Sequence, residues 1–283
     1  MNSSKQKSLA RLFPCAVVFV ILFSPPNVLA HGDSHEQIAV VTKEIAAHPN
    51  QPELLLKRAE LHRLHGEFGL ALADCQQAEK AGPKRTITQF YRGRILFDAG
   101  FYLEARAALD RFLAIEKKHA EGWLTRARAS MKLENFGAAA ADFSKAIEFA
   151  SVPEPDFYME RAAAWLAAGN LETALVGIDE GISRLGAVAS LEIPAIELDV
   201  KLQRYDSALH RIDVLAAQSQ RKETWHLKRG EVLEKAGRLS EATEAYAKTA
   251  EALAQLPPRY KLSEPTKRLE NQLAAARQRL QTH

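Results

Sequence analysis

Residues 52–85 read PELLLKRAELHRLHGEFGLALADCQQAEKAGPKR. Apolar and small residues recur in this stretch at intervals of three and four, in two runs separated by a turn that contains Gly66. Such spacing predicts two amphipathic helices that pack as a hairpin. The pattern starts again after 34, 34, 35, 34 and 34 residues, at Thr86, Ala120, Pro155, Ala189 and Glu223. The chain therefore contains six copies of one helical hairpin.

Two positions in the unit indicate how its helices pack. The twentieth residue is alanine in all six units, as Ala71, Ala105, Ala139, Ala174, Ala208 and Ala242. The twenty-fourth residue is large in five units, as Leu109, Phe143, Ile178, Ile212 and Tyr246. Alternating small and large side chains across facing helices allow the layers of a core to interdigitate. We therefore expect two helix backbones to pass closely at each alanine.

The seventh residue is arginine in five units, as Arg58, Arg92, Arg126, Arg161 and Arg229. One interpretation is a basic ladder that binds an anion. The other is structural, because a half-buried arginine needs a carboxylate or carbonyl partner. Asp74 and Asp142 recur at matching positions of the second helix, opposite Arg58 and Arg126 respectively. We favour ion pairs across the hairpin.

The pattern resembles the tetratricopeptide repeat family, which has a small residue at position 8, glycine near 15, alanine at 20, an aromatic residue at 24 and proline near 32. The resemblance covers residues 52–256 and divides them into repeats at 52–85, 86–119, 120–153, 155–188, 189–222 and 223–256. It implies an all-α fold, an α-solenoid of six helical hairpins in a right-handed superhelix. The first helices of the hairpins would line a concave groove.

Further helices are expected at both ends of the array. Residues 31–51 form an N-terminal segment with a half-repeat helix, because Pro49 falls where the closing proline of a preceding repeat would lie. Residues 257–283 form a linker and a capping helix. Leu269, Leu273, Ala276 and Leu280 make one apolar stripe of that helix, which suits a cap over the last repeat.

The fifth repeat departs most from the pattern. Glu192, Ile196 and Asp199 occupy positions that are usually apolar or small. Pro194 lies inside the first helix, where it removes a hydrogen bond and clashes with the preceding turn. We expect that helix to be kinked or shortened.

Residues 1–30 have the parts of a secretory signal peptide. Lys5, Lys7 and Arg11 precede an apolar run over 12–23, and small residues lead to a cleavage site after Ala30. The run is shorter than the roughly 20 residues of a spanning helix, so we expect a cleaved, periplasmic or secreted protein without a membrane span. The rest of the chain has 35 basic and 35 acidic residues. This balance argues against nucleic acid as a partner.

The resemblance also implies where a protein or peptide partner would bind. Family members use positions 2, 5, 9, 12 and 13 of each repeat to line the groove. Here those positions give Leu56, Arg63, Phe90, Arg94, Phe97, Leu124, Arg128, Met131, Glu197 and Glu231. The groove is thus expected to be basic and apolar at one end and acidic at the other. The alternative interpretation is that these are solvated faces and contacts within the array.

Catalytic motifs are missing from the sequence. His62 and His65 lack the glutamate and the spacing of a zinc protease helix, and neither a nucleophile elbow nor a phosphate-binding glycine loop occurs. We therefore expect a non-enzymatic scaffold or adaptor without a cofactor. Cys75 lies at an apolar position of the repeat, so a buried, inert thiol is expected there.

A second hypothesis concerns a metal ion. Cleavage after Ala30 would make His31 the first residue, with His35 four residues later. A free α-amine and two imidazoles can hold Cu(II) in a planar set of nitrogen ligands. The alternative is a frayed polar terminus before a helix. Self-association through the convex face or the terminal helix is a third interpretation.

Overall fold

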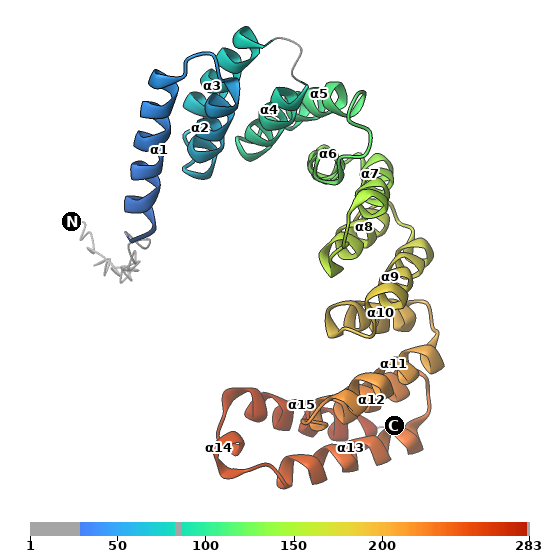
Figure 1. Cartoon of the computed structure of the whole chain (residues 1–283). Helices are drawn as coiled ribbons and strands as arrows, with labels where there is room; N and C mark the ends of the chain where they lie inside the picture. The colour runs from blue at the N-terminus through green and yellow to red at the C-terminus, as the bar shows by residue number, and fades with distance from the viewer. Residues whose placement is uncertain (1–28, 83–85, 282–283) are drawn as a thin grey trace, which may run out of the picture.

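The structure is a computed structural model that describes residues 29–82 and 86–281. These residues form fifteen helices and no strand, arranged as an open arc (Figure 1). The fold class expected from the repeats, an α-solenoid of six helical hairpins with an extra helix at each end, is confirmed. No helix in the described ranges combines the length and the apolarity needed to cross a bilayer.

Each repeat is one hairpin, and we number the repeats one to six along the chain. The first helices are α2 (Pro52–Leu64), α4 (Ile87–Asp98), α6 (Ala120–Lys132), α8 (Pro155–Ala167), α10 (Ala189–Lys201) and α12 (Glu223–Lys235). The second helices are α3 (Phe68–Ala81), α5 (Tyr102–Leu113), α7 (Phe136–Phe149), α9 (Leu171–Leu185), α11 (Tyr205–Gln218) and α13 (Leu239–Ala254). In Figure 1 the first helices follow the inner side of the arc and the second helices its outer side.

Three more helices lie at the ends of the array. Helix α1 (Leu29–Ala47) packs against α2 and takes the place of a second helix from a preceding repeat. At the other end, α14 (Pro258–Lys261) leads into α15 (Glu264–Gln281), which packs against α13 and α12. Leu273 and Ala276 of α15 are buried in this contact, as expected for a cap. The predicted signal peptide lies outside the described residues except for the first two residues of α1.

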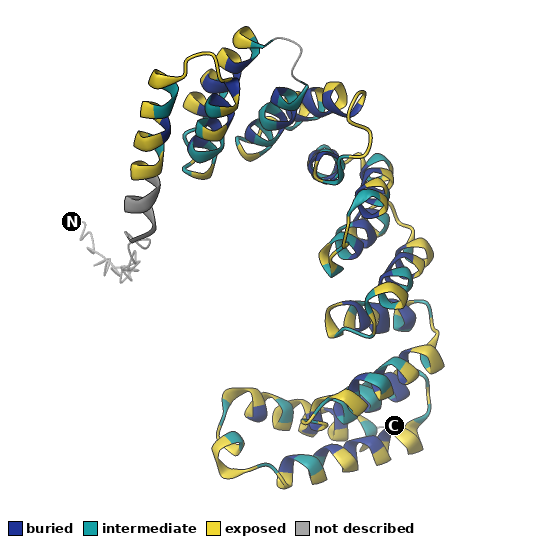
Figure 2. Cartoon of the chain, in the orientation of Figure 1, coloured by how far each residue is buried: buried dark blue, intermediate teal, exposed yellow. Residues whose placement is uncertain are grey.

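The core runs along the whole array between the two helix layers (Figure 2). All six alanines at position 20 are fully buried, which confirms the predicted close approach. Position 8 is small for a related reason. A Cβ atom added to Gly93 would lie 2.6 Å from Leu109, and one added to Gly230 would lie 2.3 Å from Tyr246. The large residue at position 24 therefore packs directly on the backbone at position 8.

The turn inside each hairpin uses a left-handed residue at position 15. Glycine fills this position in four repeats, for example Gly66 with φ of 74° and Gly169 with φ of 80°. Repeats three and five instead have Glu134 and Gln203, with φ of 58° and 59°. Glycine tolerates this conformation because it lacks a Cβ atom, whereas other residues are strained in it.

The expected shortening of the first helix of repeat five does not occur. Helix α10 has 13 residues although Pro194 lies inside it, the same length as α8 and α12. The proline therefore does not shorten the helix. Leu191 and Ile196, on either side of it, are buried at 0% and 1% exposure, and their packing holds the segment in the layer.

Candidate partner-binding surface

Arginines of the first helices are used mainly inside the array. Arg58 donates to Asp74 at 2.8 and 2.6 Å, and Arg126 donates to Asp142 at 2.8 and 2.7 Å. Both aspartates are buried. The predicted ion pairs across the hairpin are therefore confirmed for these two repeats. Since their guanidinium groups already donate to side chains of the array, they do not form an anion-binding ladder.

Repeat five also has a buried ion pair between its two helices, but the arginine and the carboxylates have exchanged helices. Arg211 comes from the second helix, α11, and donates to Asp199 at 2.7 Å and to Glu192 at 3.1 Å, both on α10. It also reaches Asp179 on α9 at 2.5 Å. Glu192 and Asp199 are 4% and 1% exposed. The acidic residues that make repeat five unusual in sequence are thus the buried partners of one arginine.

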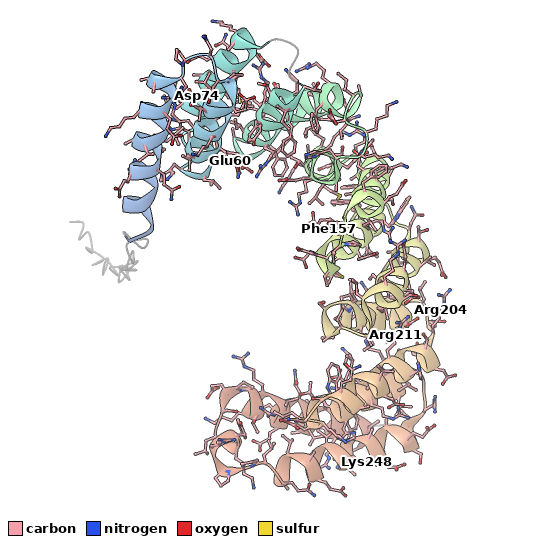
Figure 3. The ribbon with its side chains drawn as sticks, viewed as in Figure 1. Glu60, Asp74, Phe157, Arg204, Arg211 and Lys248 are labelled. Carbon is pink, nitrogen blue, oxygen red and sulfur yellow. The ribbon has the colours of Figure 1, made fainter. Side chains whose placement is uncertain are left out.

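The inner surface, meaning the side of the first helices that faces the inside of the arc, begins with three predicted arginines. Arg63 donates to Glu60 at 2.9 and 2.8 Å and also contacts Asp98 of α4. Arg94 lies 3.1 Å from Glu60 and 3.4 Å from Glu121. Figure 3 labels Glu60 on this inner side.

Arg128 completes this series, because it donates to Glu160 of α8 at 2.8 and 2.6 Å. Burial opposes ionisation of Glu60, but hydrogen bonds and charges from Arg63 and Arg94 lower its pKa. The arginines therefore tie neighbouring repeats together and are neutralised by acidic side chains. The prediction of a basic surface at this end of the groove is wrong for that reason.

Predicted apolar residues divide into two groups. Leu56, Phe90 and Leu124 are 4%, 4% and 6% exposed and belong to the core. They support the wall of the groove and offer almost no surface to a partner, which corrects their assignment as contact residues. Phe97 and Met131 are half-buried residues of the first helices α4 and α6.

The C-terminal part of the inner surface is hollowed. One cavity of about 260 Å³, the anchor hollow, lies between α10, α12 and α15. Ile193, Thr224, Trp225, Leu227, Leu269 and Gln272 contribute to its lining. Ile193 is 41% exposed, and Trp225 and Leu269 are half-buried. Three helices thus bring apolar side chains to one solvent-accessible depression.

A second cavity of about 260 Å³, the lysine hollow, adjoins the first along α10 and α12. The two share Ile196, Lys228 and Glu231. The charged residues that line it are Glu197, Lys201, Lys228, Glu231 and Lys235. The predicted residues Glu197 and Glu231 do lie together here, but three lysines accompany them. The sequence predicts an acidic surface at this end of the groove, and the three lysines show that this prediction is wrong.

Several of these residues follow the same groove positions that gave the predicted set. Ile193 holds position 5 of repeat five, while Lys201 and Lys235 hold position 13 of repeats five and six. Applying the positions fully to the last two repeats would have found them. Trp225 and Leu269 carry no such signal, because Trp225 stands outside the groove positions of its repeat and Leu269 belongs to the capping helix.

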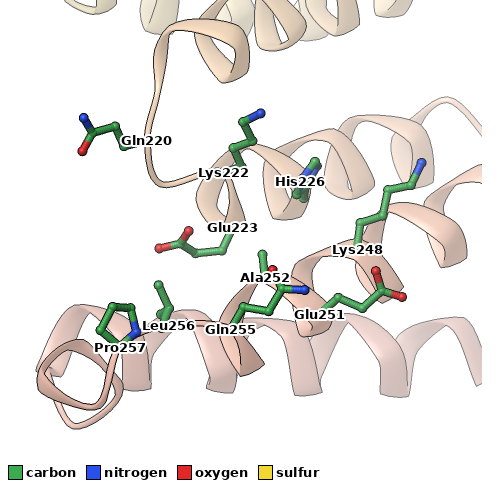
Figure 4. Close-up of a pocket in the computed structure, with 10 residues that line it drawn as sticks. All are labelled: Gln220, Lys222, Glu223, His226, Lys248, Glu251, Ala252, Gln255, Leu256 and Pro257. Atoms are coloured by element: carbon green, nitrogen blue, oxygen red, sulfur yellow. The ribbon is translucent and has the colours of Figure 1, made fainter.

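Another cavity, of about 400 Å³, lies between the first turns of α12 and the last turns of α13 (Figure 4). Lys222, His226 and Lys248 line it together with polar and acidic groups. Burial lowers the pKa of His226, and the charges of Lys248 and Lys222 lower it further. Glu223 of this cavity is buried and pairs with Arg221 at 2.5 Å.

The histidines at the start of the chain do not form a recognisable metal site. His35 lies against His65, the residue that follows α2, with ring centroids 5.1 Å apart, and the side chain of His31 is outside the described residues. In the described part of the chain, no group of three or more histidine, cysteine, aspartate or glutamate side chains has the geometry of a metal site. The metal hypothesis therefore gains no support. Burial raises the pKa of the Cys75 thiol to about 12, as expected for an inert core residue.

Comparison with known proteins agrees with this geometry. The family model described as tetratricopeptide repeat matches residues 90–153, 124–181 and 195–257, which together exceed half of the chain. No curated protein gives a significant match.

Among solved structures, the C-terminal part of a repeat-containing protein from Cytophaga hutchinsonii is 14% identical, with a TM-score of 0.62 over 81% of this chain and 94% of that one. The type IV pilus biogenesis factor PilW is 20% identical, with a TM-score of 0.54 over 69% and 92%. A tetratricopeptide repeat protein from Parabacteroides merdae is 17% identical, with a TM-score of 0.50 over 87% and 94%. At these identities the likeness concerns the fold. The chain belongs to the tetratricopeptide repeat family, whose members bind protein or peptide partners.

Proposed function

We propose that this protein is an exported, periplasmic, non-enzymatic scaffold that holds a segment of a partner protein on its inner surface. The observation that carries the proposal is the anchor hollow between α10, α12 and α15 together with the adjoining lysine hollow between α10 and α12. Apolar side chains in a solvent-accessible depression, surrounded by polar and charged groups, are the usual composition of a recognition surface. A partner that fills the anchor hollow would remove Ile193 and Trp225 from water.

Within the groove, the C-terminal section favours binding more than the N-terminal section does. Arg63 and Arg128 already have carboxylate partners within the chain. A ligand that competed for them would have to break those ion pairs first. In the described structure the side chains of Glu197, Lys201 and Lys235 make no ion pair or hydrogen bond, so they remain available to a partner. The binding role predicted for Glu197 and Glu231 is therefore retained, and that of the arginines becomes secondary.

Export follows from the sequence of residues 1–30 alone. A basic start, a short apolar run and small residues before Ala30 direct a chain to the secretory route. Fractionation of cells that express the full chain should place it in the periplasm, with His31 as the first residue by N-terminal sequencing. A cytoplasmic protein that retains residues 1–30 would contradict export but would leave the binding proposal intact.

A site-specific photo-crosslinker tests the binding site directly. The photoreactive amino acid benzoylphenylalanine replaces Ile193 in one variant and Val176 in the other, both produced in native cells. Val176 is the matched control because it is 64% exposed on α9, a second helix on the outer side. We expect a light-dependent adduct of defined mass at position 193 alone. No adduct at 193, or the same adduct at both positions, would contradict binding in the groove.

A further inference from the structure

We infer that the segment held by this groove is acidic and amphipathic, with a large apolar side chain in the anchor hollow and carboxylates at Lys201 and Lys235. The inference rests on the proposed function and specifies the chemistry of its partner. It follows from the order in which apolar and charged side chains succeed one another along α10 and α12.

Three helices form the anchor hollow. Ile193 comes from α10, Trp225 from α12 and Leu269 from α15, and all three line the same cavity of about 260 Å³. Trp225 and Leu269 also pack on the buried core, so the floor of the hollow is fixed by the fold. Buried apolar anchors in such a pocket supply most of the energy of a protein interface. A leucine, phenylalanine or tryptophan of the partner has room to enter.

The adjoining lysine hollow is positively charged. Lys228 and Glu231 lie 3.8 Å apart and offset each other. Two lysines, Lys201 and Lys235, then remain against one glutamate, Glu197. Because Lys201 and Lys235 are the last residues of α10 and α12, they lie at corresponding ends of neighbouring helices. Carboxylates of a partner complement that pair of charges.

The distance between the anchor hollow and the lysine hollow sets the length of the partner segment that can reach both. Eight residues of one helix separate Ile193 from Lys201, and at 1.5 Å per residue this is about 12 Å. A helical partner segment covers that distance with about eight residues and an extended one with about four. The partner should therefore carry its carboxylates about two helical turns, or four extended residues, from its apolar anchor.

Selection from a peptide library tests this chemistry while the partner itself is unidentified. A phage-displayed library of random 14-residue peptides is panned on the mature protein and on the double variant Lys201→Glu/Lys235→Glu. We expect the wild-type protein to select peptides with a large apolar residue and a net negative charge. The double variant should select peptides of the opposite charge that keep the apolar residue.

A matched control uses two other exposed lysines from the same part of the array. Lys222→Glu/Lys248→Glu makes the same change of charge in the cavity of Figure 4, outside the groove. A peptide selected on the wild-type protein should bind this control with unchanged affinity. It should bind the Lys201/Lys235 variant about tenfold more weakly, because each exposed ion pair contributes up to about 1 kcal/mol. Ile193→Asp should weaken binding at least as much.

Folding is checked separately from binding. Far-ultraviolet circular dichroism and the melting temperature of every variant are compared with those of the wild-type protein. Should the glutamate variant melt lower, Lys201→Gln/Lys235→Gln takes its place, because it removes the charge without placing carboxylates at two helix ends. It should weaken binding in the same direction.

The inference is overturned if the wild-type protein selects basic or uncharged peptides, or no peptides. It is also overturned if Ile193→Asp leaves binding intact, or if the control variant loses as much affinity as the Lys201/Lys235 variant. A crosslink at position 193 together with any of these results would leave the proposed function standing and remove only its acidic partner. No crosslink at 193 would remove the proposed function itself.

Discussion

Repeats three and five bury the same kind of contact in opposite directions. In repeat three the arginine stands on the first helix and the aspartate on the second, as Arg126 and Asp142. In repeat five Arg211 stands on the second helix, and its carboxylates, Glu192 and Asp199, stand on the first. The hairpin therefore requires a neutral interior between its helices and does not fix which helix carries the cation. A repeat pattern that assigns one residue type to each position does not detect such an exchange of charges between the helices.

The two contacts also differ in how many groups depend on the cation. Asp142 has Arg126 as its partner, while Arg126 has a second carboxylate, Asp110, at 2.6 Å and lies 4.5 Å from the centre of the Trp123 ring. In repeat five the dependence is reversed, because one guanidinium serves several carboxylates. Loss of the arginine should therefore harm repeat five more than loss of the aspartate harms repeat three.

The largest effect is expected from Arg211→Met. It leaves Glu192 and Asp199 buried without a cation, and removing one partner of a buried ion pair costs about 3–5 kcal/mol. Urea denaturation followed by circular dichroism measures the loss, and hydrogen exchange should increase in α10 and α11. The control is Arg204→Met, because Arg204 pairs with Glu172 on the surface and Figure 3 shows it on the same part of the array as Arg211. If both variants lose the same stability, the buried network is not what stabilises repeat five.

A smaller loss is expected from Asp142→Leu. Arg126 keeps Asp110 and its contact with Trp123, so the variant loses the buried hydrogen bonds without stranding an unpaired charge. We expect a cost of about 1–3 kcal/mol, the usual range for an unsatisfied polar group. The same denaturation experiment measures it. A cost equal to that of Arg211→Met would show that the second carboxylate gives Arg126 no relief.

The double variant Arg126→Met/Asp142→Leu tests whether replacing both partners of the ion pair costs less stability than removing one partner. Well-packed apolar residues often replace a buried ion pair at little or no cost. With Arg126→Met as the second single variant, we expect the double-mutant cycle to give a coupling free energy of at least about 1 kcal/mol, typical of residues in contact. Additive losses in the double-mutant cycle would contradict a direct interaction between these side chains.

The same contrast shows what the sequence predicts and what it does not. The hairpins follow from alanine at position 20, because a backbone contact leaves one possible side chain and the signal repeats six times. The pairs of Arg58 and Arg126 follow because both partners recur at one spacing. The network of Arg211 does not follow, since its carboxylates come from two repeats, and Glu192 and Asp199 have no acidic counterpart at the same positions of the other repeats.

The candidate site was predicted less well, for a physical reason. Groove positions identify which side chains face inward, but they do not say whether a neighbour has already neutralised them. Arg63 and Arg94 share Glu60, a contact between repeats that depends on their relative rotation. Leu269 reaches the anchor hollow from a helix outside the repeat pattern. Such contacts depend on packing between units, which no single repeat encodes.

The smallest expected effect is a gain in stability at the turn that repeats three and five share. Both place a residue with a side chain in the left-handed conformation, Glu134 and Gln203, where four other repeats have glycine. Glu134→Gly and Gln203→Gly should each stabilise the protein by about 1 kcal/mol, because the left-handed conformation costs a residue with a Cβ atom about 1–2 kcal/mol and glycine's extra freedom in the unfolded chain offsets part of that gain. The melting temperature measures the gain, and Gly169→Ala should lower it.

Equal gains in repeats three and five would show that their hairpin turns are equivalent although the polarity of their buried charges is opposite. A gain in repeat three alone would mean that the turn of repeat five is held by its own contacts. Asp199 lies next to that turn and accepts hydrogen bonds from the side chains of Ser207 and Arg211. The reversed ion pair would then determine the shape of the loop as well as the neutrality of the core.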